Sequence, residues 1–454
     1  MISNVERYFM KNFMRIIESV YRDINLLLII VVGMCFGYSG SVAAESGVPV
    51  TQVRNPSLSR LGEFKKIKRL WDDAHLKDTP EIYPANGIVA KGVKSIFFRG
   101  LPYKGRETRV FAWYCIPVNK DSKKVPAMVL IHGAGGTAIV QWVRLWNKRG
   151  YAAISLDTHG AFPVLNRRDQ VIKKMPHDYS GPRPSRWGGF EYGDEDIRDQ
   201  WMFHAVADAI LAHSLIRSFP GVDENRIGIT GISWGGVLAC IAASVDPRFK
   251  CAVPVYGCGF LGEKTSWAEE LRQLEIKGQK WLRMWDPSGY LEDIKIPVLW
   301  IASTNDPYFY LPSLQKSYRL IAPYSTLCIR VDMGHNIGEG LKPGEIYAFT
   351  DSILKNKKPL PEILEQGRTK DQAWITFRSS FPIVKAEFNY TIASGLWKKR
   401  KWKIGDAEVD NTENRATTRI PKGTTVYYFN IIDKRNLIVS SPCVIERSGV
   451  RKNL

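Results

Sequence analysis

The segment from Arg226 to Gly236, RIGITGISWGG, constrains the fold of this chain more than any other. Its first half is a short apolar run, typical of a strand buried on both faces. Its second half places Ser233 between Gly231 and Gly235, and a run of small residues with helical character follows. A sharp turn from strand to helix strains the serine backbone and leaves no room for bulky neighbours. We therefore predict a strand, a tight turn and a helix here, with the Ser233 hydroxyl exposed.

Strand-like apolar runs alternate with helix-like runs through the middle of the chain. The runs expected to form strands are residues 108–118, 125–133, 151–157, 226–232, 251–257, 296–303 and 325–332. This alternation predicts an α/β fold with a mainly parallel sheet and helices on both faces. Such sheets bind ligands at the carboxyl ends of their strands.

Two regions are expected before this sheet. Residues 1–44 have the features of a signal peptide, because basic residues precede the apolar run at 26–38 and small residues follow it. Cleavage is expected after Ala43 or Ala44, and an uncleaved anchor is the alternative. Residues 45–95 are expected to form an irregular N-terminal extension with a short helical piece.

The α/β domain itself is expected to cover residues 96–358. Two insertions, at about 158–196 and 260–290, interrupt its alternation and are interpreted as lids or pocket walls. After a proline-containing linker, residues 365–454 contain short alternating segments separated by turn residues. We predict a small C-terminal antiparallel β-sandwich there, whose task is binding glycans, docking on the catalytic domain or spacing.

Charge and cysteine content limit which partners, metals and cofactors the chain is expected to bind. The formal net charge is +19, but the basic residues are scattered and form no nucleic-acid-binding module. The densest basic run, residues 398–403, is interpreted as a solvated face. Seven cysteines occur, one of them in the expected signal peptide, and their spacing matches no metal site and fixes no disulfide pairing. We therefore expect no nucleic acid, no metal and no cofactor.

A serine nucleophile needs a base and a carboxylate that orients the base. His335 is the only histidine after Ser233, and it lies among glycines just after a predicted strand. Asp306 directly follows another predicted strand. The order serine, aspartate, histidine, with gaps of about 70 and 30 residues, is the order that one class of serine hydrolases uses. Asp332, three residues before His335, is the rival for the carboxylate.

An oxyanion formed at Ser233 needs two N–H donors. The backbone N–H of Trp234, at the start of the predicted helix, is the first candidate. The glycine-rich loop at residues 130–138 supplies the second, with Ala134 preferred over Gly135. His132 in this loop is interpreted as a structural brace.

The pieces HGAGG, RIGITGISWGG, STND and MGHN resemble the α/β-hydrolase superfamily. They are most similar to its acetyl xylan esterase, dienelactone-hydrolase-like and prolyl-oligopeptidase-like branches, over about residues 96–354. The resemblance implies that Ser233 is the nucleophile, His335 the base and Asp306 the residue that orients it. The C-terminal region resembles a β-sandwich appended to some exported bacterial relatives.

These observations predict an exported serine esterase of the acetyl xylan esterase type, acting on acylated carbohydrate or another small ester. Export would leave it periplasmic, at the cell surface or secreted, without stable membrane insertion once the signal is cleaved. Trp187 in the first insertion is a candidate pocket wall, because tryptophan rings pack well against sugar faces. His159 and Tyr256 are further pocket candidates. Three tryptophans of the second insertion (Trp267, Trp281 and Trp285) are candidates too, with core packing as the alternative for each tryptophan.

Two alternatives stay open. One is a serine peptidase of the prolyl-oligopeptidase kind, although the segment before residue 96 is too short for the large N-terminal propeller that such peptidases usually carry. The other is a non-catalytic glycan-binding protein whose working part is the C-terminal sandwich. The oligomeric state cannot be predicted from these features.

Overall fold

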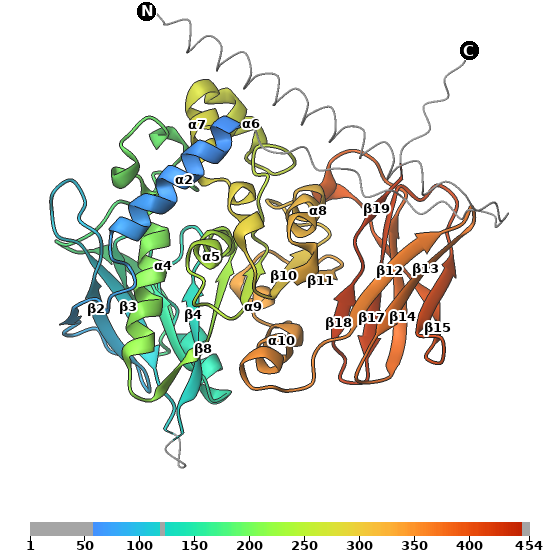
Figure 1. The fold of residues 1–454 in the computed structure, drawn as a ribbon, viewed down its shortest axis with the longest axis horizontal. Helices are drawn as coiled ribbons and strands as arrows, with labels where there is room; N and C mark the ends of the chain where they lie inside the picture. Colours follow the sequence, from blue (N-terminus) through green and yellow to red (C-terminus); the bar gives the residue numbers. More distant parts are fainter. Residues whose placement is uncertain (1–57, 119–122, 447–454) are drawn as a thin grey trace, which may run out of the picture. The chain divides into compact units, whose positions relative to one another are not determined.

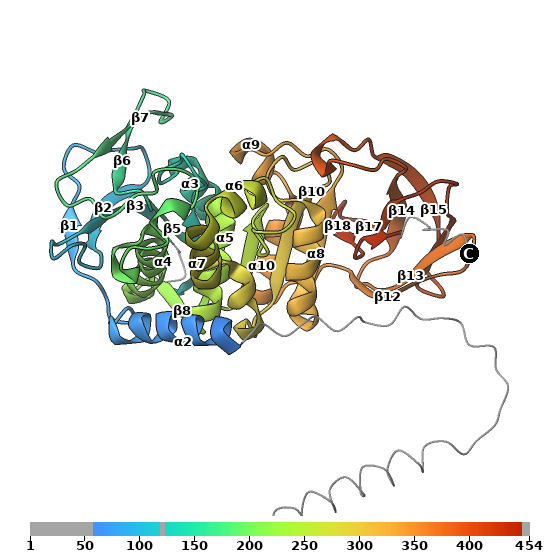
Figure 2. The same ribbon diagram turned by 90° about the horizontal axis from the view of Figure 1, so that it is seen from above.

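A computed structural model describes residues 58–118 and 123–446, drawn as a ribbon in Figures 1 and 2. The expected signal peptide at residues 1–44 lies outside the described residues. The described part of the N-terminal extension begins with the helix α2 (Leu58–Asp73), the helical piece predicted there. On its buried face, the Trp71 indole stacks on Phe203 with ring centroids 5.6 Å apart.

The first sheet has the strand order β1-β2-β3-β5-β4-β8-β9-β10-β11. Its strands are β1 (Ile82–Pro84), β2 (Lys94–Arg99), β3 (Arg109–Cys115), β4 (Val125–Ile131), β5 (Ala152–Leu156), β8 (Val222–Ile232), β9 (Ala252–Val255), β10 (Val298–Ser303) and β11 (Ser325–Arg330). Pairing is parallel from β5 to β11 and antiparallel from β1 to β5. Every residue of β4, β5, β9 and β10 is buried, as expected for strands covered on both faces.

Helices cover this sheet. They are α3 (Val140–Lys148), α4 (Trp201–Ser218), α5 (Trp234–Val245), α6 (Ala268–Gln273), α7 (Glu275–Trp285), α8 (Leu311–Leu320), α9 (Ile337–Gly340) and α10 (Gly344–Leu354). α4 and α5 pack on each other, and Trp146 of α3 meets Tyr347 of α10 with ring centroids 5.2 Å apart. The predicted α/β fold class is confirmed.

The two insertions are ordered structures. The first contains the antiparallel hairpin of β6 (Ala161–Leu165) and β7 (Val171–Pro176), which pair with each other outside the main sheet. The second contains α6 and α7. Neither the hairpin nor the pair of helices was predicted from the sequence. The hairpin has few buried residues, and the two helices are separated by only Leu274.

The C-terminal strands, residues 362–446, pair antiparallel in the order β12-β13-β16-β15-β14-β17-β18, and β19 also pairs with β17. They are β12 (Glu362–Arg368), β13 (Gln372–Arg378), β14 (Ile383–Thr391), β15 (Lys403–Asp410), β16 (Arg415–Arg419), β17 (Val426–Asp433), β18 (Ile438–Ser440) and β19 (Val444–Ile445). β12 begins inside the expected linker. β15 was not predicted, because its residues are mostly exposed and charged and form no apolar pattern.

The C-terminal strands continue the first sheet. β18 pairs antiparallel with β11 through Leu327 and Ser440, and Figure 1 shows the two strands side by side. Two of the three tryptophans of this region, Trp397 and Trp402, are buried and offer no exposed sugar platform, while the half-buried Trp374 packs against the Arg415 guanidinium. The division into domains at residues 358–365 stays a prediction. All six cysteines of the described residues are free.

Candidate active site

The turn that carries Ser233 joins β8 directly to α5. Ser233 has φ 58° and ψ −120°, a conformation that costs a residue with a side chain about 1–3 kcal/mol. A Cβ atom on Gly231 would lie 1.9 Å from the carbonyl oxygen of Gly235, and one on Gly235 would lie 2.1 Å from that of Ile131. Only glycine fits at both positions. The turn thus exists because of its glycines, as the sequence predicts.

Three side chains from separate loops meet at this turn. His335 Nε2 lies 2.9 Å from Ser233 Oγ, and His335 Nδ1 lies 2.8 Å from Asp306 Oδ2. A carboxylate only accepts hydrogen bonds, so the Nδ1–H of His335 donates to Asp306 and Nε2 is free to accept from the serine hydroxyl. Asp332 is not the partner of His335, and its backbone N–H donates to Thr304 Oγ1 at 3.1 Å.

The backbone around Asp306 fixes the orientation of its carboxylate. Asp306 is buried, and its Oδ1 accepts the N–H groups of Tyr308 and Phe309, both at 2.8 Å. Its other oxygen is thereby left for His335. This turn was not predicted from the sequence, although Pro307 follows Asp306 directly and two aromatic residues come next.

Aromatic rings enclose His335. The ring centroids of Tyr256 and Tyr308 lie 4.4 and 4.9 Å from that of His335. Tyr256, predicted as a pocket residue, is buried, and its hydroxyl donates to the Gly334 carbonyl at 2.6 Å. Burial raises the pKa of Tyr256, so its hydroxyl stays protonated and keeps this donor. Tyr256 therefore fixes the histidine loop as well as bordering the histidine ring.

The glycine-rich loop lies against Ser233. A Cβ atom on Gly133 would lie 3.0 Å from that of Ser233, so this position needs glycine. The next residue, Ala134, and Trp234 are the predicted oxyanion donors. Within residues 58–118 and 123–446, no hydrogen-bond acceptor is found for the backbone N–H of either residue. Two unpaired N–H groups next to a serine hydroxyl are what an oxyanion site requires.

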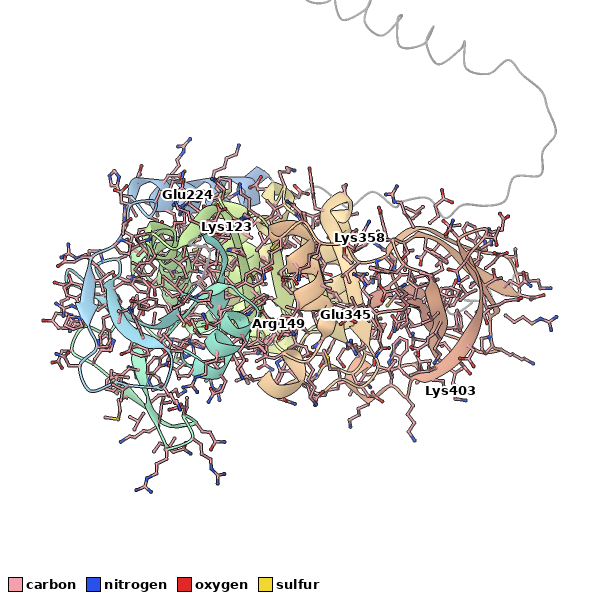
Figure 3. The ribbon with its side chains drawn as sticks, turned by 90° about the horizontal axis from the view of Figure 1, so that it is seen from below. Lys123, Arg149, Glu224, Glu345, Lys358 and Lys403 are labelled. Carbon is pink, nitrogen blue, oxygen red and sulfur yellow. The ribbon has the colours of Figure 1, made fainter. Side chains whose placement is uncertain are left out.

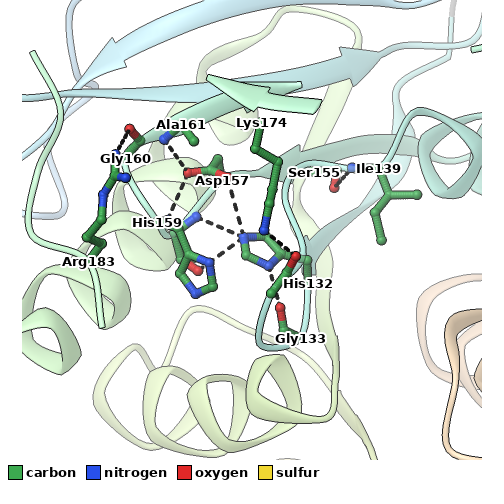
Figure 4. Close-up of polar contacts among 12 residues, drawn as sticks. His132, Gly133, Ile139, Ser155, Asp157, His159, Gly160, Ala161, Lys174 and Arg183 are labelled. Carbon is green, nitrogen blue, oxygen red and sulfur yellow. Dashed lines mark hydrogen bonds and ion pairs between the residues drawn. The ribbon is translucent and has the colours of Figure 1, made fainter. Parts of the chain in front are cut away.

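His132 braces this loop from behind (Figure 4). It lies 2.7 Å through Nδ1 from the carbonyl oxygen of Gly133, and the Thr158 N–H donates to its Nε2 at 3.0 Å. Burial lowers the pKa of His132, so the ring is neutral and can make both bonds at once. The predicted structural task of His132 agrees with these contacts.

His159, another predicted pocket residue, lies beside this brace (Figure 4). Its ring centroid is 4.8 Å from that of His132, and its backbone N–H donates to Asp157 Oδ1 at 2.8 Å. Burial lowers the pKa of His159 well below its ordinary value. Its observed contacts are thus with His132 and Trp201, behind the glycine-rich loop.

Trp187 lies on the aromatic wall that extends from His335. Its side chain is among the exposed large apolar groups, and its ring centroid is 5.5 Å from that of Tyr308. Of the candidates in the second insertion, Trp281 and Trp285 are fully buried core residues, so core packing, the alternative for each of them, holds. Trp267 is buried too, and its ring stacks on Tyr308 from behind, 5.7 Å away.

No group of three or more histidine, cysteine, aspartate or glutamate side chains in the described part of the chain is placed to hold a metal ion. The described helices are all too short or too polar to cross a lipid bilayer.

Two family models match the chain. One, described as acetyl xylan esterase, matches residues 86–271, which contain Ser233 and the glycine-rich loop. The chain has an α/β-hydrolase fold. A second model, described as PhoPQ-activated pathogenicity-related protein, matches residues 269–393, which contain Asp306 and His335.

Curated relatives match this chain only in part. Acetyl esterase Axe7A of Xylanibacter ruminicola is 26% identical over 138 residues, 30% of this chain and 30% of the relative. Dipeptidyl-peptidase 5 of Porphyromonas gingivalis is 26% identical over 188 residues, 40% of this chain and 22% of the peptidase. The chain thus spans under a third of the length of these relatives. A solved acetyl xylan esterase from Paenibacillus sp. R4 is 20% identical, with a TM-score of 0.47, and the match covers 62% of this chain and 95% of that one.

Proposed function

We propose that this hydrolase is an exported serine esterase that removes small acyl groups, such as acetate, from glycans. One observation carries the proposal. His335 bridges Ser233 Oγ at 2.9 Å and Asp306 Oδ2 at 2.8 Å, on a strained turn next to two unpaired backbone N–H groups. A buried set of this kind activates a serine hydroxyl for attack on an acyl carbonyl.

The proposed reaction has two halves. In the first, Ser233 Oγ attacks the ester carbonyl carbon while His335 Nε2 takes the hydroxyl proton. The N–H groups of Trp234 and Ala134 stabilise the oxyanion. His335 then returns the proton to the leaving alcohol, and the acyl group stays on Ser233. In the second half, His335 takes a proton from a water molecule that attacks the acyl carbon, and it gives this proton to Ser233 Oγ as the acyl bond breaks. Free Ser233, neutral His335 and a carboxylic acid that ionises in water result. Asp306 stabilises the positive imidazole in both halves.

A glycan substrate is supported by two findings. The matching family model is described as acetyl xylan esterase. The exposed Trp187 and its neighbour Tyr308 form an aromatic wall that begins at His335, and such rings pack against sugar faces. Export is proposed because residues 1–44 have the pattern of a signal peptide.

A serine peptidase is the second candidate, favoured by the partial match to dipeptidyl-peptidase 5. Peptide and ester hydrolysis use the same serine chemistry, so the geometry at Ser233 suits both. The third candidate, a non-catalytic glycan-binding protein, gives no reason for the bonds that connect Ser233, His335 and Asp306.

The test is a substrate panel with the purified full chain. We expect release of acetate from acetylated xylo-oligosaccharides and p-nitrophenyl acetate, and labelling of the protein by a fluorophosphonate. Ser233→Ala should lose labelling and lower kcat/KM by at least about 10³-fold. The matched control is Ser352→Ala, at a serine that hydrogen-bonds within α10, which should leave both readouts unchanged.

The other outcomes identify the alternatives. Cleavage of dipeptide amides without release of acetate would replace the esterase by the peptidase. An unlabelled wild-type protein that still binds xylan would favour the glycan-binding protein.

A further inference from the structure

The position of Asp306 depends on the backbone of one loop. This loop, residues 304–309, follows β10 and supplies both N–H groups that Asp306 Oδ1 accepts. Any contact that fixes the loop from outside therefore also fixes the distance of 2.8 Å between Asp306 and His335.

Asn305 makes such a contact, and it reaches the C-terminal strands. Its Nδ2 donates to the carbonyl oxygen of Arg400 at 2.7 Å and lies 3.4 Å from that of Lys398. Its Oδ1 accepts the Thr304 hydroxyl at 2.7 Å. The Thr304 oxygen in turn accepts the N–H of Asp332 at 3.1 Å. A chain of hydrogen bonds thus runs from Arg400 through the aspartate loop to the loop that carries His335.

The segment that Asn305 contacts is itself held firmly. Residues 397–399 form a short helical turn, and the Arg400 guanidinium lies 3.7 Å from the ring centroid of Trp397. Trp397 is buried, and the carbonyl oxygen of Lys401 accepts the Thr391 hydroxyl at 2.8 Å. The lysine side chains of the basic run at 398–403 are exposed, as expected of a solvated face, while the backbone of the run is held by these contacts.

The histidine loop has a second connection to the C-terminal strands. β11 ends at Arg330, five residues before His335, and Ile329 is bound on both sides. Its N–H donates to Ser440 Oγ at 2.7 Å, and its carbonyl oxygen accepts from Asn430 Nδ2 at 3.3 Å. The C-terminal strands therefore contact the bases of both loops that meet Ser233.

We propose that Asn305 is a positioning residue for Asp306, and that through it the backbone segment at 398–400 supports the active site. The inference rests on the proposed function, because it assumes that Asp306 acts on His335 during catalysis. Asn305 touches no reacting atom. It acts by tying the aspartate loop to the backbone at 398–400, and small displacements of such groups cost up to about 10²-fold in rate.

The test compares two asparagine variants. Asn305→Asp keeps the shape of the side chain but replaces the Nδ2 donor with an oxygen facing the Arg400 carbonyl. Asn411→Ala removes a remote asparagine of the C-terminal strands that also hydrogen-bonds to backbone on both sides, with Ile383 at 2.9 and 3.0 Å. Steady-state kinetics on p-nitrophenyl acetate and fluorophosphonate labelling rates are measured on the folded fraction, quantified by circular dichroism.

We expect Asn305→Asp to lower kcat and the labelling rate about tenfold to 10²-fold, with KM within twofold. Asn305→Ala should behave similarly, and Asn411→Ala should stay within twofold of wild type in kcat. The proposal is overturned if both Asn305 variants keep kcat within twofold, or if Asn411→Ala loses as much. Failure of the proposed function is distinct, since the wild-type protein would then show neither esterase activity nor labelling at Ser233.

Discussion

At the scale of single residues, burial decides which histidine side chains carry charge. His204 of α4 is buried, and its ring lies 2.7 Å through Nε2 from the carbonyl oxygen of Arg198. Burial lowers the pKa of His204 from 6.5 to about 4. The unfolded chain therefore binds a proton at this residue between about pH 6.5 and 4, while the folded chain does not. Since the unfolded state then holds more protons, stability falls as pH falls through this window.

Replacing His204 should weaken this acid sensitivity. For one group whose pKa falls from 6.5 to about 4, the loss of stability between pH 7.5 and pH 5 is about 2 kcal/mol. We expect His204→Gln, which can still donate to the Arg198 carbonyl, to lose about 2 kcal/mol less than wild type over this interval. Urea unfolding at both pH values measures the difference. An equal loss in variant and wild type would show that His204 is not protonated on unfolding.

At the scale of elements, the β6–β7 hairpin supports the glycine-rich loop. The Lys174 ammonium on β7 donates to the carbonyl oxygen of Gly135, a residue with φ 70°, as Figure 4 shows for the lysine side chain and the loop beside it. The far end of the hairpin is held by an ion pair between Arg144 of α3 and Asp169 at 2.6 Å. The hairpin therefore fixes the loop that carries the candidate donor Ala134.

Removing this support should slow the reaction without preventing folding. Lys174→Met keeps the length of the side chain but removes its donor, and a net hydrogen bond is worth about 0.5–1.5 kcal/mol. We expect kcat on a small ester to fall about threefold to tenfold with KM nearly unchanged. Lys173→Met, on the neighbouring exposed lysine, is the control and should match wild type. Equal kinetics for the two variants would show that the hairpin does not support the oxyanion site.

At the scale of the whole molecule, one buried ion pair joins the first sheet, α10 and the C-terminal strands. Glu345 of α10 is fully buried and binds Arg330 of β11 at 2.8 Å, while its Oε1 accepts the N–H of Ile438 at 2.6 Å. Figure 3 labels Glu345 at this junction. β11 and β18 also pair through Leu327 and Ser440, so the first sheet and the C-terminal strands are joined at the backbone as well.

We therefore expect the first sheet with its helices and the C-terminal strands to unfold in one cooperative transition. Glu345→Gln should destabilise the protein by about 2–3 kcal/mol, because it leaves the half-buried Arg330 without its charge partner. In calorimetry, the number of transitions reports whether unfolding is cooperative, and the shift of the midpoint reports the destabilisation by Glu345→Gln. Glu365→Gln, at an exposed glutamate of β12, is the control and should leave the midpoint unchanged. Two separate transitions in the wild-type protein would contradict this prediction.

The sequence by itself determined the features that depend on local geometry and on solvent exposure along one segment. Glycines at 231 and 235 are needed because the backbone passes within 2.2 Å of their missing Cβ atoms, so the turn at Ser233 could be recognised from five residues. The buried strands β4, β5, β9 and β10 were predicted from continuous apolar runs.

Only the tertiary structure decided which groups meet across the chain. Asp306, rather than Asp332, faces His335 because the loop after β10 turns its carboxylate inward, and spacing alone does not fix that direction. The contact of Asn305 with Arg400 joins residues that are far apart in sequence. Hydrophobic periodicity cannot predict this contact, because asparagine is not part of an apolar pattern. Hydrophobic periodicity identifies what is buried, whereas the partners of buried polar groups depend on how the elements pack.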